Sequence, residues 1–166
     1  MKRLTTLFLV LCMLFTLTAC GNIGKQSDED EVITLGDIGV TVTIPAEMKF
    51  EAKESELNDF SGFAENGEWA IIANVDLKSD YPEYTLVEYA SATSQANKGT
   101  IPGKDLNGNY YFTYTRDMGD GDIYKYYTAV LENETEYIRV AFYCFEAAWD
   151  TYRPQFKTWA ETIELE

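Results

Sequence analysis

Histidine is absent from this sequence of 166 residues. Its absence excludes Ser-His-Asp and Cys-His nucleophilic sites, imidazole general bases and nearly every kind of zinc site. Glycine-rich phosphate-binding loops are absent as well. Two carboxylates suffice for glycosidase chemistry, but the chain has 28 acidic residues and no motif selects a pair among them. The sequence therefore favours a protein that is not an enzyme, and a hydrolase with paired carboxylates is kept only as an alternative.

Basic residues are scarce: 13 lysines and arginines stand against 28 acidic residues, which gives a net charge of -15. Such a surface repels phosphate backbones and anionic lipid headgroups, so a nucleic-acid partner is excluded. It attracts cations and basic proteins.

Long apolar runs are also lacking, and the one near the N-terminus is short. Met1-Lys2-Arg3 carries two positive charges and is followed by the apolar run Leu4–Phe15. This pattern is typical of an export signal, and the run is too short for a spanning helix, which needs about 20 apolar residues. The next residues, Leu17-Thr-Ala-Cys-Gly21, resemble the lipobox of bacterial lipoproteins, which implies cleavage after Ala19 and a diacylglycerol on Cys20. The alternatives are an ordinary signal peptide with an incidental cysteine, or an uncleaved anchor.

Cysteine is nearly absent from the predicted mature domain. Cys12 leaves with residues 1–19 and Cys20 is lipidated, so only Cys144 remains and no internal disulfide is possible. Residues 21–31 are small, polar and acidic, which predicts a flexible linker that spans roughly 35 Å at full extension. Removal of Lys2 and Arg3 leaves 11 basic residues against 28 acidic ones, a charge of -17. Residues 32–166 are predicted to form one domain.

Period-two alternation and β-branched or aromatic residues predict the strands of this domain. They are expected at Val32–Leu35, Val40–Ile44, Met48–Ala52, Trp69–Asp76, Asn109–Arg116, Ile123–Leu131 and Tyr137–Phe145. In the last of these, Ile138, Val140, Phe142 and Cys144 form an apolar face.

Two helices are predicted. The sequence Thr85-Leu-Val-Glu88 is a capping box, so a helix begins there and ends near Asn97–Gly99. A second helix is expected over about Asp150–Glu164, where aromatic residues recur at three- and four-residue spacing. Pro154 is acceptable only in a first turn, which predicts a start near Tyr152.

The order of these elements, together with Val40-Thr-Val-Thr-Ile-Pro45, Tyr84-Thr-Leu-Val-Glu-Tyr-Ala90 and Phe156-Lys-Thr-Trp-Ala-Glu-Thr-Ile163, resembles the PsbP-like superfamily. The resemblance covers residues 32–166. It implies an α+β fold with a central antiparallel sheet and helices on both faces, an α/β/α sandwich. Plant members bind metal partly through histidine, which this chain lacks, so no functional residue carries over.

A cation site is one hypothesis for the loop Asp117-Met-Gly-Asp-Gly-Asp122. Asp117, Asp120 and Asp122 could offer oxygens to Ca²⁺ or Mn²⁺. The spacing is not that of an EF-hand, and glycine-aspartate sequences also suit a tight hairpin turn. We favour the turn and predict no cofactor beyond the lipid on Cys20.

Tyrosine is abundant in the last three strands, and alternation places some of these rings away from the main core. Tyr111, Tyr124, Tyr126 and Tyr143 are candidates for binding a peptide, glycan or flat small molecule. The other interpretation is packing against the helices. The sequence as a whole predicts an exported lipoprotein, anchored to the outer face of the cell membrane, that binds an envelope protein or assists the assembly of a membrane complex. The alternative is a binding protein for a small solute or divalent cation.

Overall fold

The computed structural model describes residues 30–119 and 121–166. The predicted signal peptide, Cys20, most of the linker and Asp120 therefore lie outside the described residues. Asp30 and Glu31, predicted to end the linker, instead pair with Pro45 and Ile44 in the first strand. Their side chains stay exposed, so the backbone forms the ladder while the carboxylates remain in water.

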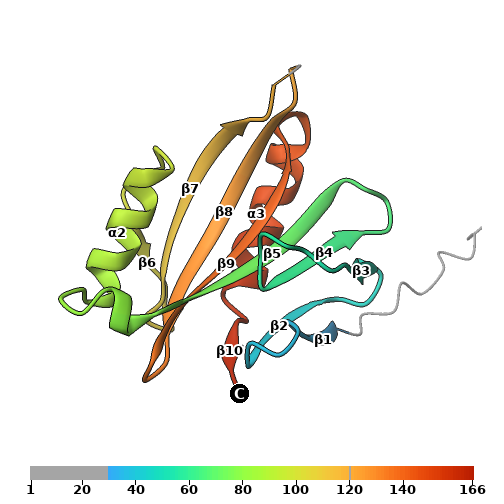
Figure 1. The fold of residues 1–166 in the computed structure, drawn as a ribbon. Coiled ribbons are helices and arrows are strands. Elements are labelled where there is room, and N and C mark those ends of the chain that lie inside the picture. The colour runs from blue at the N-terminus through green and yellow to red at the C-terminus, as the bar shows by residue number, and fades with distance from the viewer. Residues whose placement is uncertain (1–29, 120) are drawn as a thin grey trace, which may run out of the picture.

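The described residues form two antiparallel sheets, two α-helices and two short 3-10 helices (Figure 1). The larger sheet has the strand order β3 (Phe50–Ala52), β4 (Phe60–Ala64), β5 (Trp69–Leu77), β9 (Glu136–Phe145), β8 (Ile123–Glu132), β7 (Tyr110–Asp117), β6 (Gly103–Lys104). The smaller sheet has the order β1 (Asp30–Thr34), β2 (Val40–Pro45), β10 (Glu164–Leu165). The helices are η1 (Lys78–Asp80), α2 (Leu86–Ala96), η2 (Glu146–Ala148) and α3 (Trp149–Ala160). No helix among the described residues is long and apolar enough to cross a membrane.

The main core lies between one face of the larger sheet and a layer made of α3 and the smaller sheet. Phe142 on β9 contacts the rings of Phe156 and Trp159 on α3, and Trp69 on β5 packs 4.9 Å from Trp159. Residues of β2 belong to the same buried cluster. The predicted apolar face of β9 is confirmed, since Ile138, Val140, Phe142 and Cys144 all lie in this core.

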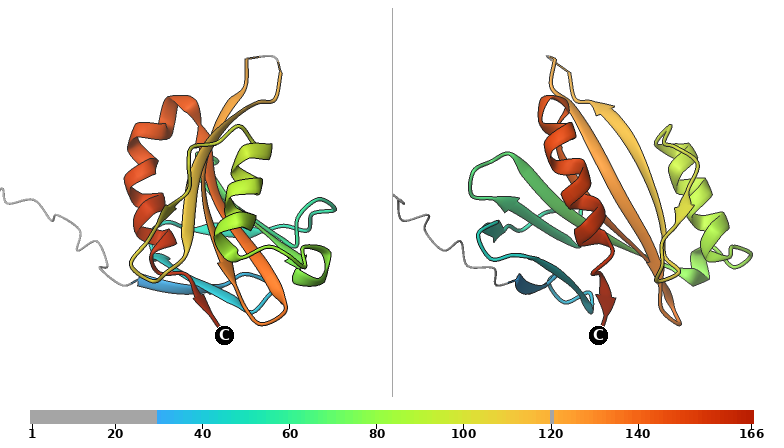
Figure 2. Two further views of the ribbon diagram at one scale, coloured as in Figure 1. Left: turned by 90° about the vertical axis from the view of Figure 1, so that its left-hand side faces the viewer. Right: turned by 180° about the vertical axis from the view of Figure 1, so that it is seen from behind.

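A second, smaller core lies under α2. Tyr89 and Ala90 of the helix pack against Phe112, Val130 and Tyr137. These strand residues alternate with those of the main core, so they belong to the other face of the larger sheet. The mixed α+β, mainly antiparallel fold is as predicted, but the complete sandwich is not. Helix α2 packs mainly on β7 and β8, with Tyr89 also stacked on Tyr137 of β9, and α3 shares its layer with the smaller sheet (Figure 2).

The aromatic helix differs from its predicted bounds at both ends. It begins at Trp149, not near Tyr152, so Pro154 lies inside it. The early start places Trp149 on the buried stripe, and this burial offsets the one hydrogen bond that proline cannot make. The helix ends at Ala160, because the chain then turns to pair with β2. There the Thr43 N–H donates to the Thr162 hydroxyl, and Glu164 pairs with Thr41 in β10.

Three short strands were not predicted: β4, β6 and β10. β4 reads Phe-Ser-Gly-Phe-Ala and shows no clean alternation. Its Gly62 is required by packing, since a Cβ there would lie 2.6 Å from the Phe50 ring on the neighbouring strand. Glycine at position 62 allows the close approach of another strand but does not itself favour a strand, so the sequence did not predict β4.

Candidate functional site

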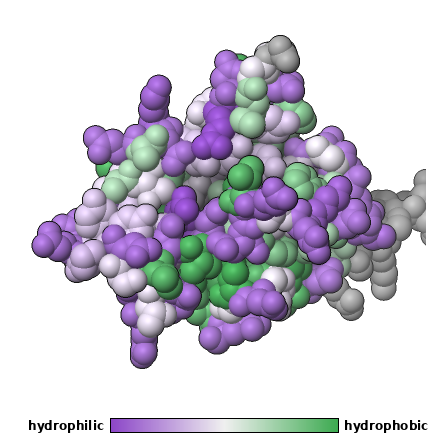
Figure 3. All heavy atoms as spheres, in the orientation of Figure 1, coloured by the Kyte–Doolittle hydropathy of each residue, from purple (hydrophilic) through white to green (hydrophobic). Residues whose placement is uncertain are grey.

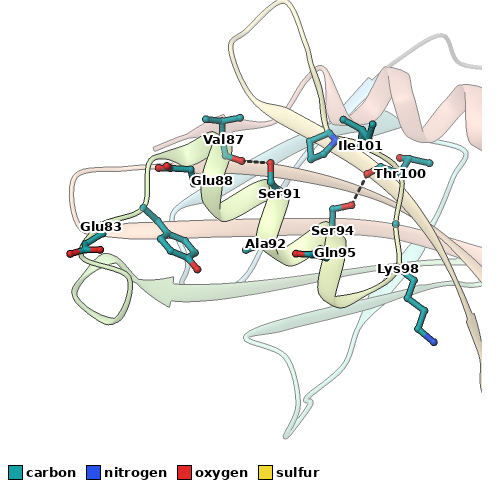
Figure 4. A pocket seen from close by; sticks show the side chains of 13 residues that line it. Glu83, Val87, Glu88, Ser91, Ala92, Ser94, Gln95, Lys98, Thr100 and Ile101 are labelled. Atoms are coloured by element: carbon teal, nitrogen blue, oxygen red, sulfur yellow. Dashed lines mark hydrogen bonds between the residues drawn. The ribbon is translucent and has the colours of Figure 1, made fainter.

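A hollow of about 880 Å³ lies between α2 and the segment 98–102 that follows it. We call it the α2 groove (Figure 4). Its lining residues are Glu83, Tyr84, Val87, Glu88, Ser91, Ala92, Ser94, Gln95, Lys98, Gly99, Thr100, Ile101 and Pro102. They come from one continuous stretch, so the local structure of that stretch determines the shape of the groove.

The predicted capping box fixes the start of α2. The Glu88 carboxylate accepts hydrogen bonds from the Thr85 N–H at 2.8 Å and from the Thr85 hydroxyl at 2.7 Å. These hydrogen bonds favour the ionised form and hold the pKa of Glu88 below its ordinary value. Glu88 is therefore a fixed negative charge at the groove.

A Schellman motif fixes the end of α2. Lys98 has a φ of 55°, its N–H donates to Gln95 O, and the Gly99 N–H donates to Ser94 O at 2.8 Å. The Ser94 hydroxyl then donates to Thr100 O at 2.6 Å, which ties the segment 98–102 back to the helix (Figure 4). A Cβ at Gly99 would lie 2.8 Å from the Ser94 hydroxyl oxygen and 3.0 Å from Thr113 O. The wall of the groove that residues 98–102 form is thus held in place by these hydrogen bonds and by the close contacts at Gly99.

Replacing Lys98 with glycine is expected to stabilise the fold by about 1 kcal/mol, because a left-handed backbone conformation costs a side-chain-bearing residue roughly that much. Urea unfolding followed by circular dichroism measures the effect. The matched control is Asn97→Gly, one residue earlier, where φ is -93° and glycine offers no such gain. Equal stability changes in the two variants would contradict the proposed role of the backbone at Lys98.

The α2 groove exposes apolar side chains from both of its walls. Tyr84 and Val87 are exposed on the helix side, and Ile101 on the opposite wall is 94% exposed. The Ser91 and Ser94 hydroxyls donate to the backbone oxygens of Val87 and Thr100. These two hydroxyls are already bonded, so the uncharged part of the lining combines the apolar side chains with bonded hydroxyls and the Gln95 amide.

A row of aromatic rings crosses the face of the larger sheet that also carries α2; we call it the tyrosine row. The ring centroids of Tyr114 and Tyr126 are 4.4 Å apart and those of Tyr126 and Tyr143 are 4.9 Å apart, both pairs stacked. Tyr124 continues the row against Tyr143 and against Phe145, which is exposed. The structure thus brings together three of the four predicted tyrosines, Tyr124, Tyr126 and Tyr143.

Tyr111 does not join them. It faces the opposite side of β7 and stacks on Tyr127 at 5.6 Å. The reason is strand alternation: Tyr111 pairs with Ala129 of the main core, whereas Tyr114 pairs with Tyr126. Tyr114 was not among the predicted binding residues, although its odd spacing from Tyr111 indicates the opposite face.

The rings of the tyrosine row largely pack against each other. Burial raises the pKa of Tyr143 and of Tyr114 to about 12, so both hydroxyls are neutral near pH 7. A hollow of only about 90 Å³ lies at the end of the row, between Phe63, Tyr143 and Phe145. The stacked ring faces are used within the fold, which favours a packing role for the row over the binding of a flat ligand.

The loop between β7 and β8 has the geometry of a turn. Asp117 accepts a hydrogen bond from the Gly119 N–H at 2.8 Å, and the Asp122 N–H donates to Gly119 O at 3.0 Å. Gly119 and Gly121 have φ values of 91° and 89°, which favour glycine. Among residues 30–119 and 121–166, no three potential ligating side chains lie close enough to hold a metal ion. The predicted site at Asp117, Asp120 and Asp122 includes a residue outside this range and stays a prediction.

Calorimetric titration of the protein with Ca²⁺ and Mn²⁺ is expected to give no binding heat and no change in melting temperature. The side chain of Asp117 already bonds within the turn, and this leaves it less free to ligate a cation. An Asp117→Asn variant, which keeps the turn acceptor, is the control for heats of dilution. Saturable heat that this variant loses would overturn the turn interpretation and support the cation site.

Cys144 is buried on β9, and burial raises the pKa of its thiol to about 11. A thiol that stays protonated near neutral pH is a weak nucleophile. The predicted place of Cys144 on the apolar face of this strand agrees with its burial.

No protein-family model matches the chain, and no curated protein matches it. Among solved structures, the chain is similar to cyanobacterial PsbP (CyanoP) from Synechocystis sp. PCC 6803, with a TM-score of 0.59 and 15% identity over 91% of this chain and 99% of that one. It is also similar to a mutant of the protein Mog1, with a TM-score of 0.49 and 8% identity over 82% of this chain and 96% of that one. At such identities the likeness concerns the fold, and the chain has the PsbP-like fold that its sequence predicted.

Proposed function

We propose that this chain is a non-enzymatic, exported protein-binding module, held at the outer face of the cell membrane by a lipid on Cys20. Its partner protein binds in the α2 groove. The observation that carries the proposal is the exposure of apolar side chains on both walls of one concave surface: Val87 on α2 and Tyr84 just before it, and Ile101 across from them. Apolar groups gathered in this way mark interaction surfaces.

The place of the groove in the fold suits a partner beyond the membrane surface. The described chain begins at β1, and α2 lies at the other side of the molecule from β1 in Figure 1 and in the right-hand view of Figure 2. A linker attached before β1 leaves α2 facing away from the point of attachment. The groove would then be open to other proteins rather than pressed against lipid.

Two further facts support a role other than catalysis. The whole chain has no histidine, and Cys144, its one cysteine beyond position 20, is buried with a raised thiol pKa. The similarity to cyanobacterial PsbP concerns the fold and agrees with an accessory module.

Site-specific photocrosslinking of the anchored protein in cells tests the proposal. A photoreactive residue at Val87 or Ile101 is expected to capture the same protein, because the two positions lie on opposite walls of one groove. The matched control is Thr151, which is exposed on α3. Capture from Val87 should fall about five-fold in an Ile101→Asp variant, since a buried charge opposes apolar contact. Identical adducts from all three positions, or none from the groove, would refute the proposal.

A further inference from the structure

The charged residues that line the α2 groove are divided between its two ends. Glu83 and Glu88 lie at the N-terminal end of α2, and Lys98 lies at the C-terminal end (Figure 4). Between them the lining is uncharged. The groove therefore has a negative end, an uncharged middle that includes Val87, Ala92 and Ile101, and a positive end.

Lys98 contributes this positive end from a costly backbone conformation. It is the non-glycine residue with positive φ among the described residues, at a position where glycine is the usual choice. A side chain kept in such a conformation beside a cavity indicates a role for that side chain. Its ammonium group is the one positive charge among the lining residues.

We infer that the segment bound in the α2 groove is an apolar peptide stretch with basic residues at the end that lies over Glu83 and Glu88. This inference rests on the proposed function and specifies its partner. Charge complementarity carries it: two carboxylates lie at one end of the groove, and Lys98 at the other end repels basic groups.

The environment of the two carboxylates strengthens the inference. The Glu88 carboxylate is held in place by Thr85, so it is oriented before binding and loses little side-chain entropy. The excess of acidic over basic residues in the chain attracts a basic segment over longer distances and speeds its association. An acidic segment would meet repulsion both at Glu83 and from the protein as a whole.

The length of α2 sets the length of the bound stretch. Its 11 residues span about 16 Å. That distance corresponds to about five residues of extended chain or three turns of helix. The apolar part of the partner segment therefore needs to present only a few side chains, those that meet Val87, Ala92 and Ile101.

Two synthetic peptides test the inference on the full chain displayed on phosphatidylcholine vesicles, with empty vesicles as the blank. Both peptides share a short apolar centre of leucine and alanine, and they carry either two lysines or two glutamates at one end. Fluorescence anisotropy is expected to show binding of the lysine peptide about tenfold tighter than of the glutamate peptide, with the difference shrinking as salt is raised.

Variants separate the groove from general charge attraction. Glu83→Gln combined with Glu88→Gln, which retains a capping side chain, should weaken binding of the lysine peptide about five-fold. The matched control, Glu54→Gln with Glu56→Gln, removes the same charge from the exposed loop before β4 and should leave affinity nearly unchanged. Lys98→Gln should tighten binding about two-fold.

Equal losses in the two double variants, or equal affinity for both peptides, would overturn the inference and leave the protein-binding function standing. Failure of the function itself would appear in the crosslinking experiment, as an absence of captured protein at Val87 and Ile101. Binding of the lysine peptide that is insensitive to Lys98→Gln would argue against the proposed placement of its basic end.

Discussion

Replacing Phe156 with alanine is expected to lower the free energy of unfolding by about 3–5 kcal/mol, the range for deleting a buried aromatic ring. Phe156 is fully buried at the centre of the main core. Its ring lies 5.7 Å from Phe142, 5.8 Å from Tyr152 and 5.6 Å from Trp159. Alanine leaves a cavity between α3 and β9 that neighbouring rings cannot fill without leaving their own contacts.

Urea unfolding monitored by tryptophan fluorescence measures this loss. The matched control is Phe145→Ala, which removes the same ring from a side chain that is 40% exposed at the end of β9. The control should cost well under half as much, because less apolar surface returns to water. Equal losses of unfolding free energy in the two variants would contradict the place of α3 in the main core.

Replacing Cys20 with serine is expected to abolish lipid attachment and to reduce the membrane-bound share of the protein strongly. Diacylglycerol is attached to a cysteine thiol in the lipobox pattern that Leu17–Gly21 resembles. Two acyl chains hold a protein stably at a bilayer, whereas the remaining apolar run Leu4–Phe15 is too short to span one.

Labelling of cells with an alkyne analogue of palmitate, followed by membrane fractionation, measures both effects. Cys144→Ala serves as the control, since it removes the buried cysteine of the domain and should keep both the label and the membrane association. Label that persists in Cys20→Ser, or a membrane share that is unchanged, would refute lipid anchoring at this residue. The α2 groove could still bind a protein in that case.

The elements that the sequence determined by itself are those with a strong local signal. The three consecutive strands β7, β8 and β9 lie within one residue of their predicted bounds, because their tyrosines and β-branched residues favour a pleated backbone. The start of α2 was determined by Thr85 and Glu88, whose mutual hydrogen bonds form within one turn of chain. The apolar stripe of α3 identified the helix, although not its bounds.

The tertiary structure decided everything that depends on residues far apart in the chain. β10 forms because Glu164 pairs with Thr41 of β2. Position 62 requires glycine because the Phe50 ring packs against it. Neither requirement can be recognised from the neighbouring residues in the sequence. Tyr111 and Tyr124 look alike in sequence, and only the register of β7 on β8 places them on opposite faces. Figure 3 shows hydrophilic residues over much of this face and hydrophobic ones gathered in its lower middle, a distribution that composition alone does not give. The α2 groove arose where the chain turns back after α2: the Ser94–Thr100 hydrogen bond and the contacts at Gly99 set Ile101 opposite Val87. Residues that are 14 positions apart on a helix and a loop have no shared periodicity, and only the folded backbone makes them walls of one surface.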